Sequence, residues 1–123
     1  MARNFTLDMH PMGKARPRVT RTGHAFMPTA YRKWKAEFVA RCMALPLKDR
    51  KTIDGPVSIT VLFYTKTGNM RSDCDNAYAA VLDGLQDAKI IANDRQVKCG
   101  CFTLFDGPKD CIGIIIEEKN ANR

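Results

Sequence analysis

The run over residues 57–64 constrains the fold of this chain more than any other segment. It reads Val-Ser-Ile-Thr-Val-Leu-Phe-Tyr, and this density of β-branched and aromatic residues is typical of a strand in a sheet. Gly55 and Pro56 precede it and mark a turn. A chain of 123 residues has the length of one ordinary domain. We therefore expect a single domain, residues 1–123, built around this strand.

Two segments have the spacing of amphipathic helices. The first begins at Pro28, with Thr29 as its expected N-cap, and its apolar residues recur at intervals of three and four. These residues are Tyr31, Trp34, Phe38, Cys42 and Leu45. The second helix is expected to start with Asp75 or Asn76 as its cap and to end near Gln86. Both helices therefore have one apolar stripe with which to cover a sheet.

Further strands are expected at residues 5–9, 97–105 and 111–117. The last two are joined by residues 106–110, which we interpret as a five-residue hairpin loop. Residues 21–24 have the composition of a turn. The expected order is strand, helix, strand, helix, strand, strand. This order predicts an α+β fold in which a single mixed sheet packs with two helices; the tail from residue 119 is expected to fray.

Positive charge is concentrated in one part of the chain. Lys and Arg number 20 against 13 Asp and Glu, and the segment 9–36 has no acidic residue. Such a segment is either a solvated face that aids solubility or a surface that contacts nucleic-acid phosphates. Its basic residues are Lys14, Arg16, Arg18, Arg21, Arg32, Lys33 and Lys35.

The five cysteines are an odd number in a chain whose first residues lack the pattern of an export signal. They indicate reduced thiols in a cytoplasm rather than a disulfide framework. Cys99 and Cys101 are closer in sequence than the usual pairs of a structural zinc site. We interpret them, with Cys111, as small strand residues, and a zinc site is the alternative. No apolar run approaches the ~20 residues of a membrane span, so no membrane association is expected.

Three aspartates form the candidate catalytic group. Asp73 and Asp75 are two residues apart, so in extended backbone both point to one side, where they repel each other unless a cation or a proton lies between them. Asp94 reaches them only if the chain doubles back after the second helix. Carboxylate oxygens are suitable ligands for Mg²⁺ or Mn²⁺. A site of this kind beside a basic surface is suited to phosphodiester hydrolysis. The spacing alone is equally compatible with capping and turn residues.

Several spaced motifs together resemble the RusA family of small Holliday junction resolvases, which are common in phages and prophages. The motifs are Asp-Cys-Asp-Asn at residues 73–76, Val-Leu-Asp-Gly-Leu at 81–85 and Asn-Asp-Arg-Gln-Val at 93–97. Arg-Pro-Arg at 16–18 and the start of the first helix also resemble phage members. The similarity covers nearly the whole chain and is strongest over 73–97.

The resemblance implies an endodeoxyribonuclease that uses Mg²⁺, with Mn²⁺ as a substitute. It implies a homodimer that binds four-way DNA junctions in recombination and repair and cuts two strands of like polarity symmetrically. The family's metal-binding acids fall on Asp73, Asp75 and Asp94. Asn76 is expected to support the site at the helix start, and Asp83 to orient a ligand or a basic residue.

The chain departs from the family pattern at two positions. Asn93 replaces the first acid of an Asp-Asp pair, and Ala79 replaces a lysine that some members carry. Candidates for the missing positive charge are Lys14, Arg16, Lys89 and Lys98. Arg71 joins the basic residues of segment 9–36 as an expected DNA contact. Two alternatives stay open: a basic module that binds nucleic acid without cutting it, and a nuclease specific for flaps or forks.

Overall fold

The computed structural model describes residues 2–119. The tail beyond residue 119, for which the sequence predicts fraying, lies outside the described residues. The elements are β1 (Ala2–Leu7), β2 (Arg18–Val19), β3 (Ala25–Phe26), α1 (Thr29–Met43), α2 (Leu47–Arg50), β4 (Val57–Thr65), α3 (Cys74–Asp87), the 3₁₀ helix η1 (Asp94–Gln96), β5 (Val97–Asp106) and β6 (Cys111–Glu118). Within this part of the chain, no helix combines the length and apolar character needed to cross a membrane.

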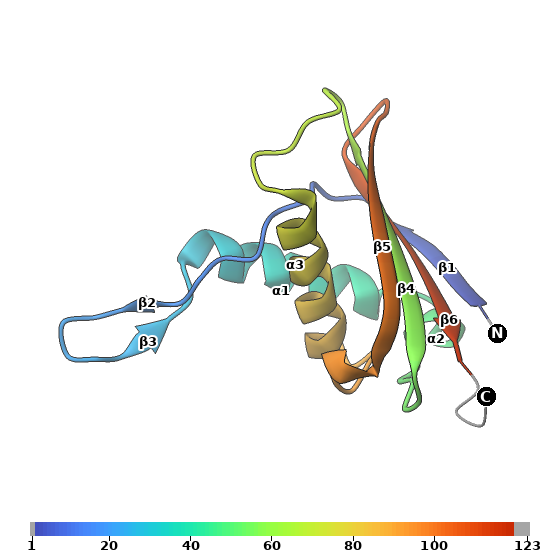
Figure 1. Cartoon of the computed structure of the whole chain (residues 1–123), viewed down its shortest axis with the longest axis horizontal. Coiled ribbons are helices and arrows are strands. Elements are labelled where there is room, and N and C mark those ends of the chain that lie inside the picture. Colours follow the sequence, from blue (N-terminus) through green and yellow to red (C-terminus); the bar gives the residue numbers. More distant parts are fainter. Residues whose placement is uncertain (1, 120–123) are drawn as a thin grey trace.

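A mixed sheet of four strands forms one layer, in the order β1-β6-β4-β5. β4 pairs parallel to β5 and antiparallel to β6, and β1 pairs antiparallel to β6. Helices α1 and α3 form the second layer and cover one face of the sheet (Figure 1). The α+β prediction is confirmed. The structure adds the short helix α2 and a separate two-stranded sheet of β2 and β3, which flank the turn expected at residues 21–24.

The core lies between β4 and the two helices. Alternate side chains of β4 are fully buried, as the period-two pattern of a strand with one covered face requires. In the helical layer, Phe38 of α1 packs directly over Gly84 of α3, where an added Cβ would overlap the Phe38 ring. This close approach brings α1 and α3 together on the sheet. The fully buried apolar strand residues include Val57, Ile59, Val61, Phe63, Ile112, Ile114 and Ile116.

The N-cap of each helix lies earlier in the chain than the sequence predicts. Thr29 is the first residue of α1, and the extended Pro28 (φ −55°, ψ 144°) is its N-cap, so the expected cap at Thr29 is wrong. In α3 the extended Asp73 is the N-cap, and Asp75 lies in the first turn. Because neither cap residue uses its side chain as an acceptor, the usual side-chain capping signal is absent at both starts.

The expected hairpin between β5 and β6 is also wrong, because β4 lies between these two strands. Their connection instead passes over the end of β4, where the Gly107 N–H donates to the Thr65 carbonyl (2.9 Å). The Asp110 carboxylate accepts from the Lys66 N–H (3.0 Å). The loop therefore spans two strand spacings, about 9.6 Å, and leaves the most apolar strand paired on both edges.

Candidate active site

The two neighbouring aspartates of the candidate group lie at the start of α3. Asp73 is the N-cap and Asp75 lies in the first turn, and both are exposed. The Asp75 carboxylate accepts a hydrogen bond from the Asn76 N–H (2.9 Å). The free N–H groups and the dipole at a helix start favour negative charge. Both side chains are therefore ionisable groups that a ligand in solvent can reach.

The segment that precedes the basic arm is fixed to this helix start. The Lys14 N–H donates to the Asn76 carbonyl (3.1 Å), and the Asn76 side-chain amide donates to the Lys14 carbonyl (3.1 Å). Gly13 permits the approach, since a Cβ there would lie 2.5 Å from Cβ of Ser72. Asn76 thus holds the Lys14 backbone beside the helix, a contact between residues 62 positions apart.

A hollow of about 290 Å³ runs along α3 from this point. Its lining residues are Lys14, Ala79, Leu82, Asp83, Gln86, Asn93, Asp94 and Arg95. Of the four basic residues considered for the charge absent at Ala79, Lys14 alone lines this hollow. Lys14 therefore stands on the same surface as Ala79 and Asp94.

Asp94 lies at the other end of α3. It begins η1, and its N–H donates to Oε1 of Gln86 (3.1 Å). Asn93 is the N-cap of η1: its side chain accepts from the Arg95 N–H (2.8 Å), and Gln96 bonds back to the Asn93 N–H (2.9 Å). This reciprocal capping gives a structural reason for an amide at position 93.

The structure does not bring the three aspartates together within one chain. Gln86, the neighbour of Asp94, lies eleven residues after Asp75 in α3, which is about 16 Å along the helix axis. No three His, Cys, Asp or Glu residues among those described are grouped so as to hold a metal. The reason is topological: β4 and β5 are parallel, so the crossover must return the chain to the opposite end of the sheet. The carboxylates are suitable ligands for Mg²⁺, but within one chain they lie at opposite ends of α3.

Asp83 ties α3 to α1. It accepts hydrogen bonds from the Tyr31 hydroxyl (2.6 Å) and from Nζ of Lys35 (3.2 Å), which also lies 3.1 Å from Asp87. Burial opposes the charged form, but the bonds from Tyr31 and Lys35 outweigh it and lower the pKa of Asp83. Asp83 therefore fixes the position of one basic residue, Lys35, and its predicted support of the metal site stays a prediction. Lys35 was predicted from the sequence as a DNA contact, but in the structure its ammonium group already pairs with Asp83 and Asp87.

The other predicted DNA contacts are exposed. β2 and β3 form an arm that projects from the helical layer (Figure 1). In its two strands Val19 is 68% and Phe26 44% exposed, so the arm presents apolar as well as basic side chains. The predicted DNA contacts that are exposed are Lys14, Arg16, Arg18, Arg21, Arg32, Lys33 and Arg71.

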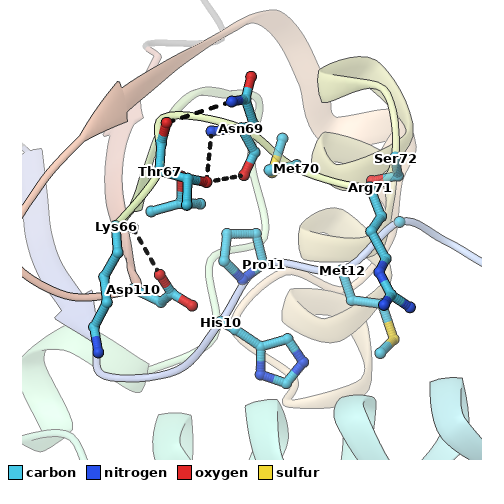
Figure 2. Close-up of a pocket in the computed structure, with 12 residues that line it drawn as sticks. His10, Pro11, Met12, Lys66, Thr67, Asn69, Met70, Arg71, Ser72 and Asp110 are labelled. Atoms are coloured by element: carbon cyan, nitrogen blue, oxygen red, sulfur yellow. Dashed lines mark hydrogen bonds between the residues drawn. The ribbon is translucent and has the colours of Figure 1, made fainter.

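A second hollow, of about 590 Å³, adjoins the start of α3. It lies between segment 10–13 and the loop 66–72, and Figure 2 shows His10, Lys66 and Arg71 around it. His10 and Lys66 could not be placed together from the sequence, because no local pattern relates segments so far apart. Ser72, the residue before Asp73, also lines this hollow, so the hollow extends to the loop that leads into α3.

The chain matches one known family model. A family model described as Endodeoxyribonuclease RusA matches residues 8–117. A search of the curated proteins gave no match to this chain. The matched range contains the basic arm, the carboxylates of α3 and η1, and the strands β4, β5 and nearly all of β6, and it begins just after β1. By that match this chain belongs to the RusA family of endodeoxyribonucleases, which act on Holliday junction DNA.

Proposed function

We propose that this protein is a Mg²⁺-dependent homodimer that resolves four-way DNA junctions by paired, symmetric phosphodiester hydrolysis. The observation that carries the proposal is the division of exposed carboxylates between the two ends of α3, in a chain of the RusA family. Mn²⁺ is expected to substitute, since it accepts the same oxygen ligands.

If the three aspartates bind one metal ion, a second copy of the chain must supply part of the set. In a dimer whose two α3 helices run antiparallel, the Asp73 and Asp75 end of one copy faces the Asp94 end of the other. Two equivalent sites then arise from one symmetric arrangement, which suits the cutting of two strands. When bound there, a divalent ion polarises the scissile phosphate and makes a bound water more acidic.

The remaining groups bind and orient the DNA. Lys14, held beside α3 by Asn76, supplies positive charge next to the reacting phosphate. The basic arm and the exposed Arg32 and Lys33 supply further positive charge for contacts with the DNA backbone. Each phosphate contact releases counterions, so binding should weaken as salt rises.

Cleavage of synthetic DNA tests the proposed function. With Mg²⁺, we expect symmetric nicks in a four-way junction, no cutting in EDTA, and slower cutting of flaps and forks. Binding without cutting at any Mg²⁺ or Mn²⁺ concentration would instead identify a binding module. Faster cutting of forks or flaps would identify a nuclease of different substrate preference.

Replacing Lys14 by Gln is expected to lower the single-turnover cleavage rate about a hundredfold, because one preorganised charge at a developing anion contributes about 3 kcal/mol. Junction affinity should change little, since many other basic residues remain. Lys89→Gln is the matched control: Lys89 is also exposed and does not line the hollow. Equal losses in the two variants would exclude the role assigned to Lys14.

A further inference from the structure

The outer edge of β5 is long and open. β5 has ten residues, ends the sheet and pairs only with β4 among the described residues. The opposite edge strand, β1, has six residues, and α2 packs against it while the Arg3 guanidinium donates to the Asp49 carbonyl (3.1 Å). A long uncovered edge offers free N–H and C=O groups to another strand.

The side chains of β5 suit a protein strand and not DNA. Residues 99–105 carry no charged side chain, although the chain as a whole has a net charge of +7. Phe102 and Phe105 are 39% and 41% exposed, and Cys99 and Cys101 are exposed too. An uncharged, partly apolar edge on a basic protein does not attract a polyanion.

The strand is complementary to itself in one register. Two identical antiparallel strands are related by a two-fold axis. If that axis passes through Phe102, each residue of one copy lies opposite the residue that is equally far from Phe102, on its other side, in the second copy. Lys98 then faces Asp106 of a second copy, and the two Phe102 rings meet at the axis. Opposite charges and aromatic pairs across strands both stabilise a sheet.

We propose that β5 pairs antiparallel with β5 of a second copy about an axis at Phe102, which joins the two sheets into one of eight strands. The proposal rests on the homodimer of the proposed function and names its surface. The occupant is a second copy because the register pairs opposite charges and because the aspartates of one chain are incomplete without another.

This pairing also explains how the aspartates meet. A two-fold axis perpendicular to the joined sheet keeps the helices of both copies on one face. It sets the two α3 helices antiparallel, since each runs with a fixed direction relative to its own β5. The Asp73 and Asp75 end of one helix is thereby turned toward the Asp94 end of the other.

Engineered cysteines test the register in the full-length protein. In the proposed pairing Cys101 lies opposite Thr103 of the second copy, so Thr103→Cys combined with Cys99→Ser should give a disulfide-linked dimer on mild oxidation. Cys99 is removed to prevent competing bonds. Thr6→Cys in the same Cys99→Ser background is the matched control, because Thr6 is exposed on β1 at the other edge; it should give no such dimer.

A charge at the axis provides the second test. Phe102→Lys sets two like charges opposite each other and removes an aromatic pair, so the dimer dissociation constant in sedimentation should rise at least about tenfold. Phe26→Lys on the arm, an equally exposed phenylalanine, should leave it unchanged. Circular dichroism confirms that both variants are folded.

The outcomes separate this inference from the proposed function. A dimer that crosslinks through Thr103→Cys and is weakened by Phe102→Lys supports the β5 surface. A dimer that cuts junctions but shows neither the crosslink nor the weakening would contradict the β5 surface, and the proposed function would still hold. A chain that stays monomeric at every concentration overturns the surface and the homodimer together, and absence of Mg²⁺-dependent cutting overturns the function.

Discussion

Asp75→Asn is expected to abolish cleavage of four-way junctions while leaving junction binding intact. Asn keeps the shape of the side chain but lacks the negative charge that a Mg²⁺ ligand supplies. Loss of a contribution of about 4 kcal/mol to the transition state corresponds to about a thousandfold lower rate. Folding should persist, because a single exposed carboxylate near a helix start contributes at most about 1 kcal/mol.

The measurement is single-turnover cleavage at saturating enzyme, with junction affinity determined separately in EDTA. Asp49→Asn is the matched control, because Asp49 lies in α2, on the element that packs against β1. We expect the control to cut at the rate of the unaltered protein. Full cutting by Asp75→Asn would exclude Asp75 as a metal ligand.

Local patterns predicted most of the secondary structure. The run of β-branched and aromatic residues at 57–64 is confirmed as β4, and the spacing of Tyr31, Trp34 and Phe38 in α1 is confirmed as a buried face. Such patterns are properties of a single element and need no knowledge of its neighbours. Leu45, the last residue of the predicted stripe, falls beyond the end of α1, because the helix stops before the stripe does.

The order of strands in the sheet was not predictable in the same way. A short loop between two strands usually indicates a hairpin, yet the loop after β5 crosses β4. Insertion of β4 depends on contacts between segments distant in sequence. For the same reason the contact of Lys14 with Asn76 has no local signal, and sequence left Lys14 as one of four candidates.

The motifs identified the family, which the match over residues 8–117 confirms, but not the geometry of the site. The hypothesis of one metal site required the chain to double back after the second helix, so that Asp94 could reach Asp75. Parallel pairing of β4 and β5 prevents this within one chain, since it fixes the two residues at opposite ends of α3. The assignment of the three aspartates to one metal site therefore stays a prediction that now involves two copies.

The second large effect is expected when two inactive variants are combined. Asp75→Asn and Asp94→Asn should each be inactive alone, because every shared site then lacks one ligand. After subunit exchange, a dimer with one copy of each variant has one site with both substitutions and one with neither. With half of all dimers mixed and one intact site in each, nicking should recover to about a quarter of the original rate.

A mixture of Asp75→Asn with Asp73→Asn is the matched control. Both substitutions lie at the same end of α3, so each site of a mixed dimer keeps one of them and no activity should return. Nicking of a four-way junction by the Asp75→Asn and Asp94→Asn mixture is therefore the most direct measurement of whether two copies share each site. Recovery to about a quarter of the original rate is the predicted result, and a mixture as inactive as its components would contradict the shared site.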